Sequence, residues 1–184
     1  EAIAQRHYAP QLRMWAYSRV DTIRNHEQLD LVRRAGIRWL CLGIESASRE
    51  VRLEISKGKF KDVDIREVVD MVHAADIDVL ANYIVGLPGE NLSDMQKTLD
   101  LSLELCTSGW NMYAAMALPG SQLYVDALNE GAELPSSYEG FSFHSYESLP
   151  LPSGPLLPAD SLQFRDQAFV TYHSDPRVLA RIRA

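Results

Sequence analysis

Residues 79–90 read Val-Leu-Ala-Asn-Tyr-Ile-Val-Gly-Leu-Pro-Gly-Glu, an apolar run that enters a glycine–proline turn and ends in a carboxylate. Residues 39–46, Trp-Leu-Cys-Leu-Gly-Ile-Glu-Ser, repeat this arrangement. Near-continuous apolar runs are typical of parallel strands that are buried on both faces. Open α/β sheets and βα barrels bind their ligands at the carboxyl ends of such strands. The two runs therefore predict a parallel sheet with a ligand site beside the glycines and acids.

The composition is typical of a globular domain. The 184 residues are 46% hydrophobic and 23% charged, and no apolar run approaches the roughly 20 residues needed to cross a bilayer. A net charge of −7 argues against a broad nucleic-acid-binding surface. We expect a cytoplasmic protein in which Cys41 and Cys106 are buried free thiols rather than a disulfide or a metal pair. We find no motif with metal-ligand spacing.

Strands and helices alternate over the first 130 residues. The spacing of hydrophobic residues and the positions of glycine, proline and other turn residues predict strands over 12–20, 37–44, 77–86 and 110–118. They predict helices over 26–35, 48–57 (stopped by Gly58), 62–75 and 91–106, with a further helix to about residue 129. This order predicts an α/β fold with parallel strands and right-handed crossovers.

Several helix ends carry recognisable signals. Asn25 is placed to cap the helix at 26–35, with Gln28 in the capping-box position, and Asn91 is placed to cap the helix at 91–106. Gly36 fits the left-handed position after the first of these helices. Asp76 stands where a glycine would usually end a helix, and aspartate tolerates that conformation better than most residues.

The amino-acid composition changes after residue 130. Residues 131–158 contain five prolines among serine, glycine and aromatic residues, which predicts a long irregular connection, either a lid over a site or a plain linker. Its aromatic stretch, 138–146, could close over a substrate or pack against the body of the domain. Residues 159–184 are expected to form a helical extension, with Pro176 opening the last helix after Asp175.

Three strand ends offer chemistry. Glu45 lies in an apolar context and needs a partner, so it binds a ligand, pairs with a neighbouring arginine or caps the next helix. The turn from Gly86 to Glu90 either admits a ligand close to the backbone or is an ordinary turn before a helix. Arg19 could hold a carboxylate or phosphate, or simply pair with Asp21. The five histidines show no clustering.

Taken together, these strings resemble the second half of a radical S-adenosylmethionine (SAM) enzyme core. The matching strings are Ser18–Asp21, Gly43–Ser48, Lys57-Gly58, Asn82–Glu90 and Leu118–Ser121, in the order and spacing of that family's third to sixth strands. The resemblance implies that residues 1–130 form the C-terminal half of a partial (βα)6 TIM-like barrel. Residues 164–172 more weakly resemble the tail of members that carry a cobalamin domain.

What the resemblance implies is a cofactor site. In that family a [4Fe–4S] cluster, held by a three-cysteine loop, cleaves SAM reductively to a 5′-deoxyadenosyl radical that modifies the substrate. By resemblance, Glu45 and Ser46 contact the SAM ribose or methionine, and Arg19 contacts the methionine carboxylate. By the same resemblance, Asn82, Ile84 and Gly86 line the adenine site. An electron donor and a substrate, small or macromolecular, would be the partners, and cobalamin a possible further cofactor.

The sequence also departs from the family pattern. Asn82 replaces the first glycine of the family's Gly-x-Ile-x-Gly-x-x-Glu string, and Glu90 comes one residue late. Two cysteines cannot supply the three-cysteine loop, so the chain is expected to be an enzyme fragment that is inactive alone, with the cluster ligands upstream. One alternative is a non-catalytic binding or scaffold protein built on a degenerate half barrel. Another is a conventional βα-barrel enzyme that uses Glu45 or Glu90 as acid or base.

Overall fold

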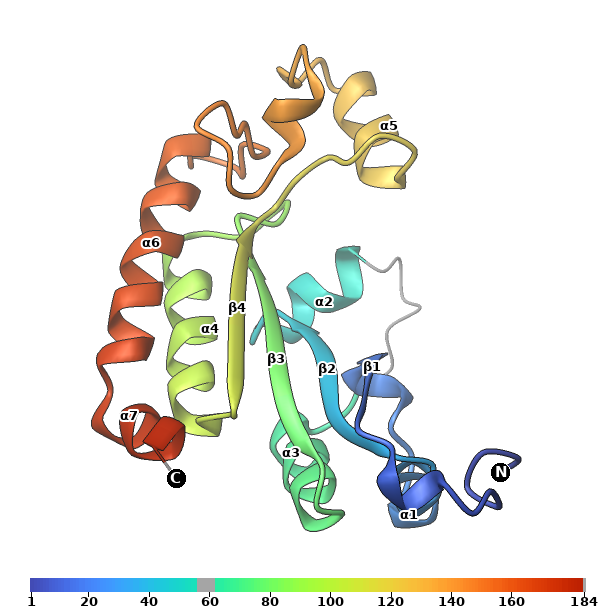
Figure 1. The fold of residues 1–184 in the computed structure, drawn as a ribbon. Helices are drawn as coiled ribbons and strands as arrows, with labels where there is room; N and C mark the ends of the chain where they lie inside the picture. Colours follow the sequence, from blue (N-terminus) through green and yellow to red (C-terminus); the bar gives the residue numbers. More distant parts are fainter. Residues whose placement is uncertain (56–61, 184) are drawn as a thin grey trace.

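The computed structural model describes residues 1–55 and 62–183, and within them the chain forms one parallel four-stranded sheet (Figure 1). The strands are β1 (Met14–Arg19), β2 (Ile37–Glu45), β3 (Asp78–Val85) and β4 (Gly109–Ala114), and they lie side by side in sequence order. The predicted α/β fold with parallel strands is thereby confirmed. The predicted helix stop at Gly58 lies outside the described residues.

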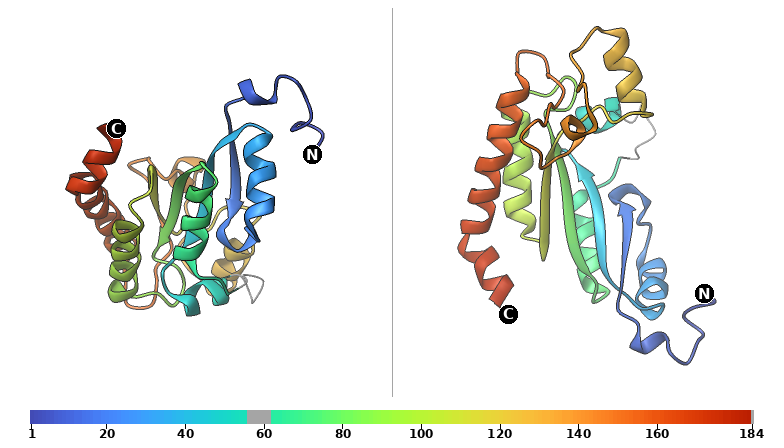
Figure 2. Two further views of the ribbon diagram at one scale, coloured as in Figure 1. Left: turned by 90° about the horizontal axis from the view of Figure 1, so that it is seen from below. Right: turned by 45° about the horizontal axis from the view of Figure 1, so that its top comes forward.

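Helices cover one face of this sheet and leave the other without a helical layer in the described part of the chain (Figure 2). The helices are α1 (His26–Arg34), α2 (Arg49–Ile55), α3 (Ile65–Ala74), α4 (Leu92–Leu105), α5 (Gln122–Asn129), α6 (Pro158–Ser174) and α7 (Pro176–Arg183). Short 3-10 turns span Ala9–Gln11, Val20–Thr22 and Tyr138–Phe141. A curved parallel sheet with helices on its outer side is the geometry of a partial βα barrel.

Local capping chemistry explains where the helices begin and end. The Asn25 side chain accepts the Gln28 N–H at 2.9 Å, but the Gln28 side chain accepts from the Arg24 N–H, one residue earlier than a capping box requires. Asn91 forms the complete reciprocal box at the start of α4. The left-handed positions after α1 and α3 fall on Gly36 (φ +102°) and Asp76 (φ +57°), as the sequence predicts.

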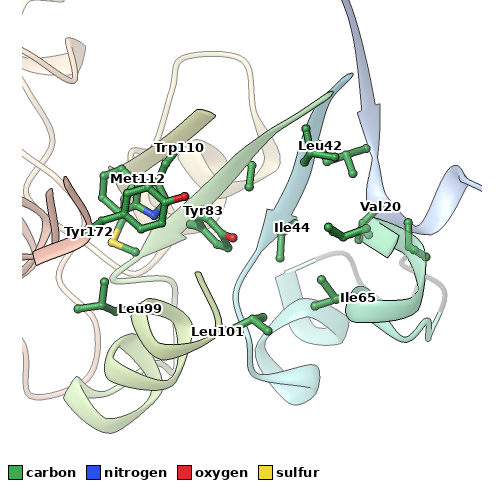
Figure 3. Packing of buried hydrophobic residues seen from close by; sticks show 14 of the residues in the cluster. Val20, Leu42, Ile44, Ile65, Tyr83, Leu99, Leu101, Trp110, Met112 and Tyr172 are labelled. Atoms are coloured by element: carbon green, nitrogen blue, oxygen red, sulfur yellow. The ribbon is translucent and has the colours of Figure 1, made fainter. Parts of the chain in front are cut away.

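The core lies between the sheet and its helices (Figure 3). Tyr83 and Met112 point from β3 and β4 toward the helices, and Trp110 stacks on Tyr172 of α6 with ring centroids 5.0 Å apart. Tyr172 also donates to the Thr107 carbonyl at 3.0 Å. Burial of these rings supplies the apolar contact that fixes α6 against β4.

One expectation about β3 is corrected by the structure. The continuous apolar run predicted burial on both faces, yet buried and half-exposed residues alternate along the strand from Val79 to Val85. The inner face, which carries Leu80, Asn82 and Ile84, meets a cavity instead of a second layer. Period-2 alternation is therefore present in the burial of β3, although it is only faint in its sequence.

Residues 131–157 form no further strand of the sheet and run beyond the carboxyl ends of the strands, together with α5 (Figure 1). The Leu151 N–H donates to the Ala115 carbonyl at 2.9 Å, and Ser153 Oγ donates to the Leu87 carbonyl at 2.5 Å. These bonds tie the segment to the ends of β3 and β4. They also help to explain why β4 ends at Ala114 instead of reaching Leu118. Across the described ranges, no helix is long and apolar enough to cross a membrane.

Candidate ligand site on the inner face of the sheet

A cavity of about 720 Å³ lies on the inner face of the sheet. All four strands contribute to its wall, and two residues of the segment 131–157, Phe143 and His144, complete it. This volume falls within the range of pockets that bind small organic ligands. Of the predicted site residues, the cavity lining includes Arg19, Glu45, Asn82 and Ile84.

Strand register brings the polar part of the site into one row. Arg19 lies opposite Gly43, Gly43 opposite Asn82, and Asn82 opposite Asn111, so the row crosses all four strands. Residues in register on neighbouring parallel strands point to the same face of a sheet. Residues 92 positions apart in sequence, 19 and 111, therefore line one wall of the cavity.

Glu45 reaches this row through an irregularity at the end of β2. The register shifts between Gly43 and Glu45, and Glu45 has φ +68°, a left-handed conformation that is uncommon for residues other than glycine. Its carboxylate lies over Gly43. Glu45 Oε1 is 2.6 Å from the position that a Cβ on residue 43 would occupy. The carboxylate therefore occupies the space that a side chain on residue 43 would need.

The charge of Glu45 is set by its surroundings. Burial raises the pKa of the Glu45 carboxyl above 4.5, and the nearby positive charge of Arg19 opposes this shift. Arg19 is itself held by Asp21, with Nε to Oδ1 at 2.9 Å and Nη2 to Oδ2 at 2.6 Å. The hydrogen bonds to Asp21 raise the pKa of the Arg19 guanidinium. Arg19, held by Asp21, therefore presents a fixed cation beside the partly desolvated carboxylate of Glu45.

The centre of the wall is made of amides. Asn111 Nδ2 donates to Asn82 Oδ1 at 3.0 Å, and Asn82 Nδ2 donates to the Leu80 carbonyl at 3.4 Å. These bonds fix which way the amide of Asn82 faces. Ile84 lies one position further along β3 on the same face and gives the amide wall an apolar neighbour.

Two predicted site residues lie outside the cavity lining. Gly86 (φ +74°) faces α6 instead, where a Cβ added to it would approach Ser161 Oγ to 2.3 Å. Ser46 is fully buried, and its hydroxyl donates to Glu90 Oε1 at 3.0 Å. Strand alternation explains Ser46, since it follows the inward-facing Glu45 and so points to the opposite side.

Glu90 is a structural carboxylate at the same end of the sheet. Its Oε2 accepts the Leu87 N–H at 3.1 Å, so the side chain braces the turn that precedes it. Ser46 joins it from β2, and Thr98 of α4 lies 3.3 Å from the Ser46 hydroxyl. The network links β2, the turn after β3 and α4, which is a positioning role for the strand ends that carry the site.

The pKa of Glu90 gives a testable pH dependence. Burial raises it above 4.5 despite the hydrogen bonds from Leu87 and Ser46, so the folded chain holds this proton more tightly than the unfolded chain. The contribution to the free energy of unfolding is present below about 4.5 and is lost as pH rises through the folded pKa. In Glu90→Gln this contribution is absent.

We therefore expect the wild-type-minus-variant difference in unfolding free energy to fall as the pH rises above about 4.5, as measured by urea denaturation. Glu133→Gln, which changes an exposed carboxylate outside the network, supplies the matched control. A difference that stays constant with pH would contradict the assignment.

Sequence reasoning did not single out several wall residues. Asn111 and Tyr113 of β4, Tyr17 of β1 and His144 all line the cavity. The alternation of β4, in which Asn111 and Tyr113 are half-exposed between buried neighbours, was the available signal for the first two. Phe143, which also lines the cavity, belongs to the aromatic stretch 138–146, for which the sequence left open closure over a substrate or packing against the domain. No periodicity indicates His144, which reaches the cavity from the same segment.

Both cysteines lie in buried or half-buried parts of the described chain. Cys41 is buried in the cavity wall and Cys106 is half-buried at the end of α4, and both are free thiols. Burial raises the pKa of the Cys41 thiol. Within the described ranges, no group of three or more His, Cys, Asp or Glu side chains could hold a metal ion.

A family comparison decides the affiliation of this chain. The model of the radical SAM superfamily matches residues 7–102, which is more than half of the chain and includes β1 to β3. The chain belongs to the radical SAM superfamily. Members of this superfamily use SAM together with a [4Fe–4S] cluster. No curated protein sequence matches the chain significantly.

Solved structures agree on the fold. The radical SAM methyltransferase TsrM from Kitasatospora setae, solved with cobalamin and a [4Fe–4S] cluster bound, superposes with a TM-score of 0.62 at 20% identity, over 70% of this chain and 25% of TsrM. Coproporphyrinogen III oxidase (HemN) from Escherichia coli gives 0.60 at 16% identity, over 91% of this chain and 37% of HemN. Elp3 from Methanocaldococcus infernus gives 0.52 at 15% identity, over 65% and 28%.

These likenesses establish the partial barrel expected from the sequence. The chain spans about a quarter of TsrM and just over a third of HemN. The radical SAM chain therefore presents one section of a barrel, with the inner face of its sheet forming the candidate site.

Proposed function

We propose that the inner face of this sheet binds SAM, as part of a radical SAM enzyme that modifies a substrate through reductive cleavage of SAM. The observation that carries the proposal is the row from Arg19 to Asn111, with the Glu45 carboxylate resting on Gly43. A fixed cation, a carboxylate and amides together match the charges and hydrogen-bonding groups of SAM.

Each group has a fitting partner in SAM. Glu45 would accept hydrogen bonds from the ribose hydroxyls or the methionine ammonium, and Arg19, held by Asp21, would attract the methionine carboxylate. Asn82 and Ile84 would border the adenine, with polar and apolar contact respectively. Ser46 and Glu90 would contribute by holding the strand ends in place.

The [4Fe–4S] cluster does not fit the residues of this chain. The sequence contains two cysteines, whereas the family's cluster loop uses three. We propose that the cluster ligands and the electron-donor contact lie elsewhere in the complete enzyme. Cobalamin, present in the TsrM structure, is a further cofactor that the complete enzyme would carry if its substrate is methylated.

The direct test is SAM binding to this chain, measured by isothermal titration calorimetry. We expect saturable binding, and we expect Glu45→Gln to weaken it about tenfold, which corresponds to the loss of one charge-assisted hydrogen bond. Glu133→Gln is the control and should bind as the wild type does. No saturable heat with the wild type, or an unchanged affinity in Glu45→Gln, would contradict the proposed site.

Catalysis is tested separately in the complete protein. After anaerobic reconstitution with iron and sulfide, we expect SAM-dependent formation of 5′-deoxyadenosine or of a methylated product. A complete protein that binds neither a cluster nor SAM would instead be the non-catalytic half barrel. Activity that tolerates oxygen and chelators would indicate a conventional βα-barrel enzyme.

A further inference from the structure

The cavity has two chemically different sides. The polar side belongs to β1 and β2, which carry the charged Arg19 and Glu45 beside Trp15 and Tyr17. The other side belongs to β4 and the segment 131–157, and its residues are Tyr113, Phe143 and His144. The Asn82–Asn111 amide pair lies between the two sides.

Phe143 and His144 are held in place by bonds to the body of the domain. Arg165 of α6 donates to the Phe143 carbonyl at 2.8 Å, and within the segment Leu149 N–H donates to the Gly140 carbonyl at 3.0 Å. The Phe143 ring packs on Tyr113, with centroids 4.8 Å apart and planes at 43°. The wall is therefore preformed, and both residues line the cavity.

We propose that this aromatic wall, defined as Tyr113, Phe143 and His144, binds an uncharged planar aromatic ring of the substrate. The inference rests on the proposed function, because it assigns the polar side to SAM and leaves the aromatic side for the second reactant. Aromatic rings pack favourably on tilted rings at this spacing. His144 is exposed, so its imidazole can also exchange a hydrogen bond with a polar substituent on that ring.

Burial along the segment supports this orientation. Phe143 is half-buried against Tyr113, whereas Tyr138 and Tyr146, the flanking tyrosines, are 88% and 106% exposed. Phe143 lines the cavity, whereas these tyrosines lie in solvent. The segment therefore has matched control positions for a binding test.

The test uses p-cresol as the probe, titrated into isotope-labelled chain by NMR in the presence of saturating SAM. Its saturated counterpart, 4-methylcyclohexanol, has similar size and one hydroxyl but no aromatic ring. We expect p-cresol to bind at least about fivefold more tightly than 4-methylcyclohexanol, as expected for ring packing. We expect Phe143→Leu to remove this preference, and Tyr138→Leu to leave it unchanged.

Two further measurements keep the result decisive. His144→Ala changes an exposed side chain, leaves folding intact, and should weaken p-cresol binding about threefold without changing SAM affinity. Displacement of p-cresol by SAM, with weaker SAM binding in Phe143→Leu, would assign the wall to adenine and overturn the inference. Equal binding of the two probes would also overturn it. Absence of SAM binding contradicts the proposed function and is measured independently, by calorimetry.

Discussion

Replacing Gly86 by alanine is expected to lower the free energy of unfolding by about 3 kcal/mol. Gly86 has φ +74°, which costs a non-glycine residue about 1 kcal/mol or more, and an added Cβ would approach Ser161 Oγ to 2.3 Å. The contact joins the end of β3 to the first turns of α6, so the variant must either strain the turn or displace the helix. Urea denaturation measures the loss.

Two companion variants separate strain from collision. Gly131 has a similar backbone conformation, with φ +71°, but nothing lies within 4 Å of an added Cβ. Gly131→Ala should therefore lower the free energy of unfolding only by the backbone strain, about 1 kcal/mol. Ser161→Ala removes the closest atom, and it should restore part of the stability when combined with Gly86→Ala. Equal losses in Gly86→Ala and Gly131→Ala, with no rescue, would show that α6 does not pack on the glycine.

Replacing Gly43 by valine is expected to weaken SAM binding about thirtyfold, or about 2 kcal/mol. The side chain would occupy the space where Glu45 Oε1 lies, 2.6 Å from the position of a Cβ. It would thus expel the carboxylate from the row and fill the cavity beside it. The change in affinity is measured by calorimetry and checked against the thermal unfolding midpoint.

A double-mutant cycle tests whether Gly43 acts through Glu45. If it does, Gly43→Val should cost much less in a Glu45→Ala background than in the wild type, because the carboxylate is already gone. Additive losses would mean that the valine simply blocks the cavity. An unchanged affinity in Gly43→Val would contradict the placement of SAM on this row.

The sequence was sufficient for the elements that local chemistry defines. Asn91 and Asp94 cap α4 reciprocally, and Gly36 and Asp76 adopt left-handed conformations after their helices, because each outcome depends on residues within a few positions. The parallel order of the strands also follows from βα alternation, since crossovers are right-handed and consecutive units lie side by side.

The site was only partly predictable. Glu45 and Arg19 lie in the cavity as their strand-end positions suggested, but Ser46 and Gly86 do not line it. Ser46 follows the inward-facing Glu45, and alternation along a strand sends neighbours to opposite faces. Gly86 lies after the end of β3 with φ +74°, so the strand pattern no longer governs where it faces. Glu90 is a further example, since it serves the buried network behind the sheet and does not line the cavity.

The sequence by itself determined that this chain is a parallel βα section of a radical SAM barrel and that glycines and acids end its strands. Only the tertiary structure decided which of these residues share a wall. Register between strands set the row from Arg19 to Asn111, and the anchoring of residues 131–157 brought Phe143 and His144 to it. The physical reason is that hydrogen-bond register and packing join residues far apart in the chain, and no local pattern records such contacts.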